Sequence, residues 1–189
     1  GYGVTVFEMG QKAGGLLRTT IPSFRLPEDI LDRQIKFYED MGIRFKTNVR
    51  FGQDVTQEEL EQQGFKVFIA ATGASKPLGL AVPGVEAKEI TNAIEFLKAA
   101  KSGQVQNISG KVVVIGGGSV ALDAARSAAR LGAGSVTVVC LETIEPGLKD
   151  SMLALEEEIK DALAEGVVIQ PSRGVDSFLT KQDQVTGLK

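Results

Sequence analysis

Histidine and tryptophan are absent from this sequence of 189 residues, and cysteine occurs once, as Cys140. A chain without histidine cannot build a zinc site from imidazole or use a Ser-His or Cys-His pair in catalysis. A single cysteine also excludes an internal disulfide and any metal cluster held by several cysteines of these residues. Any chemistry must therefore come largely from a bound cofactor.

Charge and hydropathy exclude further classes of function. The net charge is −3, with 24 acidic and 21 basic side chains intermixed, so no basic face indicates a nucleic acid or an anionic membrane as partner. The apolar runs at 67–71 and 112–115 are too short to cross a bilayer, and the start shows no signal-peptide pattern. Hydrophobic residues make up 43%, enough for one sizeable core or two small ones. We expect a cytoplasmic protein.

The most informative stretch is KVVVIGGGSVALD, residues 111–123. The β-branched run Val112–Ile115 predicts a strand buried on both faces. Gly116–Gly118 predict a turn, and Ser119–Ala129 predict the helix that leaves it. The N-terminus of such a helix offers unpaired N–H groups and a partial positive charge to a phosphate.

The glycines of this stretch fit the pattern G-x-G-x-x-A. In that pattern Gly116 permits the tight turn, Gly118 lets the backbone approach a pyrophosphate, and Ala121 lets the helix lie against the strand. Glycines also gather at ordinary turns, so the context decides. A second strand at Ser135–Val139 and the acidic Glu142 just beyond it complete a strand–turn–helix–strand unit. The sequence therefore favours a dinucleotide site over a plain strand-to-helix turn.

The beginning of the chain shows a second strand that ends in an acidic residue. Val4–Phe7 predict the strand, and Glu8 follows it, where an acid of a nucleotide-binding unit accepts hydrogen bonds from a ribose diol. The first strand and glycine loop of such a unit are not in this sequence. A solvated glutamate at a strand end remains the alternative for Glu8.

Local patterns predict the other elements. Gly14-Gly15 predict a turn, and a helix is expected from Pro27 to Gly42, with Leu31, Ile35, Tyr38 and Met41 towards the core. The loop Ser75–Glu89, which contains Pro77 and Pro83-Gly84, is the best boundary between two units. The remaining expected elements are strands at Ile43–Lys46, Lys66–Ala71 (buried) and Val167–Ile169, helices at Gln57–Gln63, Ile90–Ala100 and Ser151–Glu165, and a hairpin of Val175–Thr180 with Val185–Leu188.

Five segments carry a resemblance to a known family: VTVFE, GGLLR, IPSFRLPED, FIAATGA and VVVIGGGSVALDAAR. In this order they resemble the FAD- and NAD(P)H-binding half of the glutamate synthase small-chain family, a module also found in dihydropyrimidine dehydrogenase. The resemblance implies an α/β fold, with a partial FAD-binding domain (1–76) joined to a Rossmann-type NAD(P)H-binding βαβ domain (77–189). It implies hydride transfer from NAD(P)H to FAD, with electrons passing on to iron–sulfur centres or a partner subunit.

The resemblance also assigns candidate cofactor-binding residues. For FAD they are Glu8 at the adenosine ribose, the backbone of Gly14, Gly15 and Leu16, the guanidinium of Arg25, Phe51 near the adenine, and the turn Thr72-Gly73. For NAD(P) they are Gly116, Gly117, Gly118, Ser119, Val120 and Ala121, with Leu141 and Glu142 at the ribose. A surface role for Arg25 and a core role for Phe51 are the alternatives.

Leu141 and Glu142 depart from the family, because members that use NADPH carry basic residues there. A glutamate accepts hydrogen bonds from the ribose hydroxyls and repels a 2′-phosphate, so we expect NAD(H) to be preferred over NADP(H). The alternative is a solvated Glu142, with Arg126 or Lys149 neutralising the phosphate.

Other parts of the family's pattern are not in the sequence. They are the first FAD glycine loop, the cysteine-rich cluster segment and the later return to the FAD domain. We therefore expect a piece of a longer flavoprotein that holds FAD and passes electrons to another subunit or an iron–sulfur domain. A dinucleotide-binding regulatory module without catalysis, and an interaction domain that has lost its ligand, are the competing hypotheses.

Overall fold

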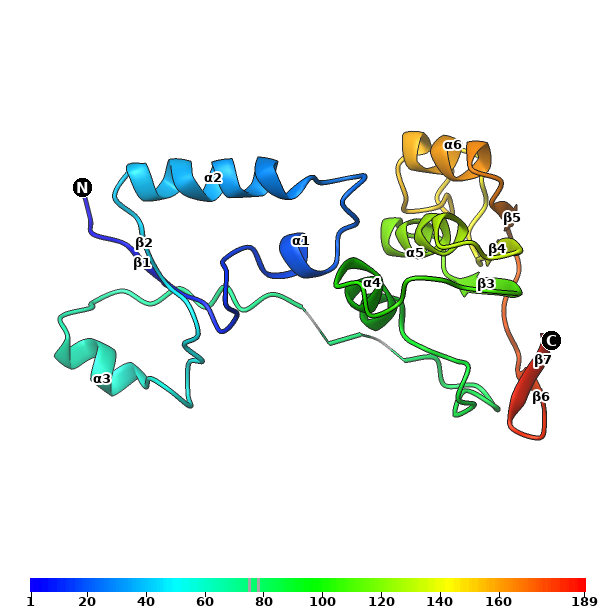
Figure 1. Ribbon diagram of the computed structural model, residues 1–189, viewed down its shortest axis with the longest axis horizontal. Helices are drawn as coiled ribbons and strands as arrows, with labels where there is room; N and C mark the ends of the chain where they lie inside the picture. The colour runs from blue at the N-terminus through cyan, green and yellow to red at the C-terminus, as the bar shows by residue number, and fades with distance from the viewer. Residues whose placement is uncertain (75, 78) are drawn as a thin grey trace. The chain divides into compact units, whose positions relative to one another are not determined.

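The computed structural model describes residues 1–74, 76–77 and 79–189. These residues form two compact units, Gly1–Ser75 and Lys76–Lys189 (Figure 1). The loop predicted at 75–89 contains Ser75 and Leu78, which lie outside the described residues. Each unit is described by itself.

The first unit contains a small parallel sheet and short helices. Strands β1 (Thr5–Phe7) and β2 (Arg44–Lys46) pair with Val6 opposite Phe45. The predicted glycine turn is present, since Gly14 and Gly15 have positive φ angles of 125° and 50°. The chain then continues directly into the five-residue helix α1 (Gly15–Thr19), which the sequence analysis did not predict. The predicted polar helix is α3 (Gln57–Gln62).

Helix α2 (Glu28–Asp40) follows Pro27 and ends before Gly42, whose φ is +92°. Only part of its predicted core-facing stripe is correct: Leu31 is buried and Ile35 half-buried, but Tyr38 and Met41 are exposed. Leu31 lies beside Gly14 at the start of α1, and α2 contacts this short helix. Thirteen helical residues extend for about 20 Å and five for about 8 Å, so α1 is too short to cover the whole of α2.

The buried strand predicted at Lys66–Ala71 is wrong. The segment has no regular structure, and the side chains of Val67 and Ile69 are 76% and 85% exposed. An extended segment becomes a strand only when a neighbouring strand shares its backbone hydrogen bonds. Within the described residues of this unit, β1 and β2 pair with each other and neither pairs with this segment.

The second unit is built on a three-stranded parallel sheet, in the order β3-β4-β5. The strands are β3 (Lys111–Ile115), β4 (Ser135–Val139) and β5 (Val168–Gln170), joined by helices α5 (Ser119–Arg130) and α6 (Glu156–Ala164). This confirms the predicted strand–turn–helix–strand unit and its third strand. No helix in the described part of the chain has the length and apolarity needed to cross a membrane.

The prediction that β3 is buried on both faces is wrong. Val112 and Val114 pack against the core of the unit, but Val113 points the other way and is 48% exposed. The reason is the face of the sheet on which it lies. Val112 and Val114 lie opposite Val136 and Val138 on the face that the core cluster covers, whereas Val113 lies opposite Thr137 on the other face, and Thr137 is itself only half-buried.

Two helices of this unit begin later than predicted. Helix α4 (Ala93–Lys101) starts after Asn92, whose Oδ1 accepts a hydrogen bond from Ile94 N–H at 2.9 Å. Helix α6 begins five residues after Ser151, because Met152 N–H donates to Thr143 O (2.9 Å) and is held outside the helix. The predicted hairpin is present as β6 (Phe178–Lys181) and β7 (Gln184–Leu188), which are antiparallel.

Small side chains let α5 lie close to the sheet. Ala121, Ala124, Ala125 and Ala128 recur at helical spacing, and all four are buried. Residues spaced in this way share one face of a helix. This face packs against β3 and β4, so the start of α5 is held directly beyond the end of β3.

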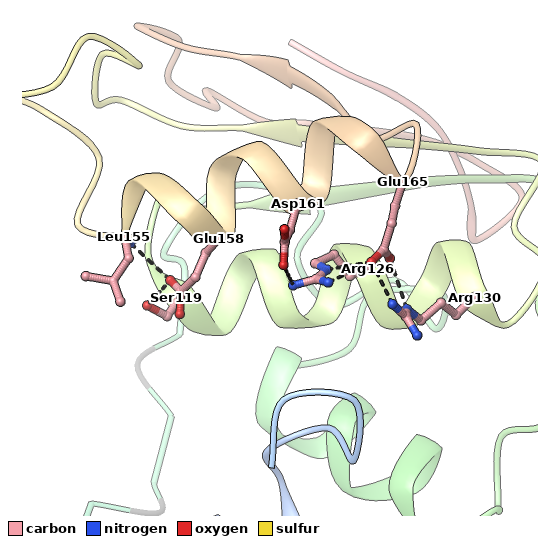
Figure 2. A network of polar contacts seen from close by, with 7 residues as sticks. All are labelled: Ser119, Arg126, Arg130, Leu155, Glu158, Asp161 and Glu165. Carbon is pink, nitrogen blue, oxygen red and sulfur yellow. Dashed lines mark hydrogen bonds and ion pairs between the residues drawn. The ribbon is translucent and has the colours of Figure 1, made fainter. Parts of the chain in front are cut away.

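Ion pairs join α5 to α6 on their polar sides (Figure 2). Arg126 contacts Asp161 at 3.1 Å and Glu165 at 2.7 Å, and Arg130 also contacts Glu165 at 2.7 Å. Hydrogen bonds from Arg130, and then from Arg126, lower the pKa of the Glu165 carboxyl to about 2. The same pair raises the pKa of Arg130.

We predict that Glu165→Gln lowers the free energy of unfolding at pH 7 by about 1–3 kcal/mol, because it leaves two guanidinium groups short of a counter-charge. The pKa of Glu165 is depressed from 4.5 to about 2 in the folded chain. Its stabilisation is therefore complete above about pH 4.5 and is lost as the pH falls towards 2. Urea unfolding of both chains should show the difference narrowing over that range. Glu157→Gln, an exposed change on the same helix, is the control.

Candidate functional site

The turn between β3 and α5 requires glycine at its first position. Gly116 has a φ of +125°, a conformation that side chains other than glycine rarely adopt. Its N–H donates to Val139 O at 2.8 Å, which ties the turn to the end of β4. A Cβ on Gly116 would lie 3.7 Å from the Cβ of Ala121. The helix therefore lies close against the strand end, as the sequence predicted.

The second and third glycines have different surroundings. A Cβ on Gly117 would lie 2.7 Å from Glu142 Oε2 and 3.2 Å from Cys140 Cβ, so this side of the turn is filled. A Cβ on Gly118 would meet no atom within 4 Å among the described residues. Gly118 is also the N-cap of α5, and among the described residues no side-chain hydrogen bond caps this end of the helix. The N–H groups of a helix start that lack intrahelical partners can bind an anion, and the space beside Gly118 is open to one.

Glu142 reaches the turn from the end of β4. Its carboxylate lies beside Gly117, while Leu141 before it is largely exposed. The segment after β5 borders the same place, because Ser172 N–H donates to Glu142 O (2.9 Å) and Arg173 N–H donates to Cys140 O (2.8 Å). The structure thus brings the carboxylate of Glu142 to the glycine turn.

The single cysteine, Cys140, is buried at the end of β4. Burial, and next the charge of Glu142, raise the pKa of the Cys140 thiol. The protonated thiol is a weak nucleophile at neutral pH. Cys140 therefore contributes packing beneath the turn rather than redox chemistry.

The cations proposed as alternative phosphate partners differ in their availability. The side chain of Arg126 is only 9% exposed, and it is held by Asp161 and Glu165. Lys149 is exposed in the loop that follows β4. Arg126 is therefore committed to the contact between the helices and does not extend to the turn.

The sequence analysis missed one contact at this site. Ser119 Oγ donates to Glu158 Oε2 at 2.6 Å, and the same oxygen accepts from Leu155 N–H at 3.1 Å (Figure 2). Glu158 is buried and lies 39 residues from Ser119. From the sequence alone, a glutamate in the first turn of an acidic helix indicates helix capping. No local pattern indicated that Glu158 would contact the glycine turn.

In the first unit, Glu8 lies at the end of β1, where the sequence placed it. Its Oε1 accepts from Gly10 N–H at 2.7 Å, and its backbone pairs with Lys46 and Val49. Gly14 and Gly15 begin α1, with Leu16 half-buried in the helix.

The other candidates for FAD contact lie on the surface of the first unit. Arg25 is exposed, and its N–H donates to Pro22 O at 3.0 Å. Phe51 is exposed, so the core alternative for it is wrong. Thr72 and Gly73 are exposed in a stretch without regular structure. Among the described residues, Phe51, Thr72 and Gly73 form no hydrogen bond with Glu8.

Comparison with protein families agrees with this geometry. A model described as pyridine nucleotide-disulphide oxidoreductase matches residues 10–189. The chain belongs to this family. Its name includes a disulphide, but one cysteine cannot form a disulfide within these 189 residues.

Two relatives confirm the resemblance that the segments indicated. The glutamate synthase [NADPH] small chain of Bacillus subtilis is 39% identical over 146 residues, which cover 72% of this chain and 29% of that protein. The NAD-dependent dihydropyrimidine dehydrogenase subunit PreT of Escherichia coli is 36% identical over 170 residues, 89% of this chain and 39% of that protein. The chain thus spans less than half the length of these relatives.

A solved structure supports the fold alone. FprA from Mycobacterium tuberculosis, as its His57Gln mutant, superposes with a TM-score of 0.66 at 23% identity, over 86% of this chain and 40% of that one. The predicted α/β dinucleotide-binding fold is confirmed by this likeness and by the family match.

We predict that Gly116→Ala destabilises the chain by about 1–2 kcal/mol, because alanine is strained at a φ of +125° even where space exists. Gly118→Ala should change the free energy of unfolding by no more than about 0.5 kcal/mol, because Gly118 has an extended backbone and open surroundings. Urea unfolding followed by circular dichroism measures both variants. Equal losses would contradict the distinction between the two glycines.

Proposed function

We propose that this chain is the dinucleotide-handling part of an NAD(P)H-dependent FAD oxidoreductase. In the complete enzyme, a hydride would pass from the nicotinamide to FAD, and electrons would continue to iron–sulfur centres or to a partner subunit. Family membership supports this proposal, as does the similarity to PreT, which is named as a subunit of a dehydrogenase.

The observation that carries the proposal is the uncapped start of α5 beside the open face of Gly118. A pyrophosphate there would accept hydrogen bonds from the N–H groups of Gly118, Ser119 and Val120. Gly116 and Ala121 set how closely the helix approaches the strand, and the carboxylate of Glu142 lies beside Gly117. The residues present therefore fit a dinucleotide.

For FAD the first unit supplies fewer contacts. Glu8 fits a ribose diol, and Gly14, Gly15 and Leu16 supply backbone, while α1 is a helix of only five residues. We propose that residues 1–76 belong to an FAD-binding domain and residues 77–189 to the NAD(P)H-binding domain. The two compact units, which divide one residue earlier, support this assignment.

The carboxylate beside Gly117 favours NAD(H) over NADP(H), on our proposal. A glutamate about 5 Å from a 2′-phosphate costs about 1 kcal/mol per charge pair in water-like screening and about 3 kcal/mol at an effective dielectric constant near 20. The two relatives do not decide the question, because the name of the Bacillus subtilis protein includes NADPH and that of PreT includes NAD.

We predict that Gly118→Val weakens NADH binding by at least about tenfold, because its side chain fills the space proposed for the pyrophosphate. Calorimetric titration of NADH into the 189-residue chain measures this. Gly3→Val is the control, since Gly3 is exposed and, like Gly118, has open surroundings for a side chain. An unchanged dissociation constant for Gly118→Val would place the pyrophosphate elsewhere.

We also predict that the chain binds NADH about ten- to a hundredfold more tightly than NADPH at matched low salt, from the repulsion by Glu142. The double change Leu141→Arg with Glu142→Arg should shift the preference towards NADPH. Equal or tighter NADPH binding by the unaltered chain would contradict the repulsive role of Glu142.

A further inference from the structure

Two contacts from the segment before and at the start of α6 converge on the glycine turn. Ala154 N–H donates to Gly117 O at 3.2 Å, and Glu158 Oε2 accepts from Ser119 Oγ at 2.6 Å. Both Ala154 and Glu158 are buried. Leu155 N–H also donates to Glu158 Oε2, at 3.1 Å, which ties this segment to the carboxylate (Figure 2).

The contact at Gly117 fixes the orientation of a peptide group. A trans peptide is planar, with its C=O and N–H pointing in opposite directions. Because Ala154 holds the C=O of Gly117, the N–H of Gly118 points away from that segment. A side chain at Gly118 would also meet no atom within 4 Å among the described residues, so this part of the turn has open space beside it.

The contact at Ser119 assigns the hydroxyl a use other than phosphate binding. A hydroxyl carries one proton to donate, and Ser119 donates it to Glu158. The backbone N–H of Ser119 then remains as its donor to an anion. Glu158 is buried and also caps α6, so its hydrogen bond restricts the side chain of Ser119. Through Ser119 it also restricts the first turn of α5.

We propose that Glu158 is a positioning residue for dinucleotide binding: through Ser119, it holds the first turn of α5 in the conformation that binds a pyrophosphate. The proposal rests on the proposed dinucleotide site. It adds to that site a role for each donor of Ser119: the hydroxyl donates to Glu158, and the backbone N–H donates to the ligand.

The test titrates the 189-residue chain with ADP-ribose, which carries the pyrophosphate, and with adenosine, which carries no phosphate. Glu158→Ala should weaken ADP-ribose binding about five- to twentyfold and adenosine binding by less than about twofold. A general loss of structure would weaken both ligands alike. Glu158→Gln should stay within about twofold of the unaltered chain, because its amide oxygen can accept both hydrogen bonds.

A double-mutant cycle separates positioning from direct contact. Ser119→Ala should weaken ADP-ribose about as much as Glu158→Ala, and the double variant should be no more than about twofold weaker than either. If the losses of affinity caused by the two single changes multiply in the double variant, the hydroxyl contacts the ligand independently of Glu158. That result would overturn the proposal. Glu157→Ala, at an exposed position on the same helix, should bind normally.

The remaining outcomes separate the two proposals. Unchanged ADP-ribose binding by Glu158→Ala, or a loss by Glu158→Gln as large as that of Glu158→Ala, would overturn the role of Glu158 and leave the dinucleotide site in place. No binding of ADP-ribose or NADH by the unaltered chain would overturn the proposed function, and the positioning role with it.

Discussion

The close packing of α5 on the sheet is the constraint on which the second unit depends. An alanine face brings the helix near β3 and β4, so the strand-to-helix connection has room for only three residues, Gly116–Gly118. A turn this tight requires the positive φ of Gly116 and leaves the start of α5 without a side-chain cap. The open helix end is thus a consequence of close packing, and anion binding makes use of it.

Helix α6 holds α5 at two places with different chemistry. Near the start of α5, Glu158 accepts from the neutral hydroxyl of Ser119, whereas near its end Glu165 and Asp161 pair with arginines. The arrangement suits the helix dipole, because cations near the end of α5 face its partial negative charge. The charged pairs stabilise the unit, and the neutral contact acts at the turn itself.

The sequence predicted what local patterns determine. The three parallel strands, α5 and the hairpin each carry their own signal in apolar periodicity, glycines or turn residues. The strands and α5 were confirmed within one residue, and the hairpin was confirmed except that β6 begins three residues later than predicted. The failures depend on partners distant in the chain. Lys66–Ala71 has the composition of a strand, but no strand pairs with it among the described residues, and Val113 lies on the face of the sheet that the core cluster does not cover. The contact of Glu158 with Ser119 spans 39 residues, so no periodicity could indicate it.

The three glycines of the turn show how one motif combines separate constraints. Gly116 is needed for its backbone conformation, and Gly117 because Glu142 and Cys140 fill the space beside it. Gly118 leaves open the space that we propose for the pyrophosphate. The second requirement is not part of the G-x-G-x-x-A pattern, in which this position is variable. A larger residue at position 117 would displace the carboxylate of Glu142. The acid at the end of β4 and the middle glycine are therefore coupled, and the choice of side chain at position 142 limits what position 117 can hold.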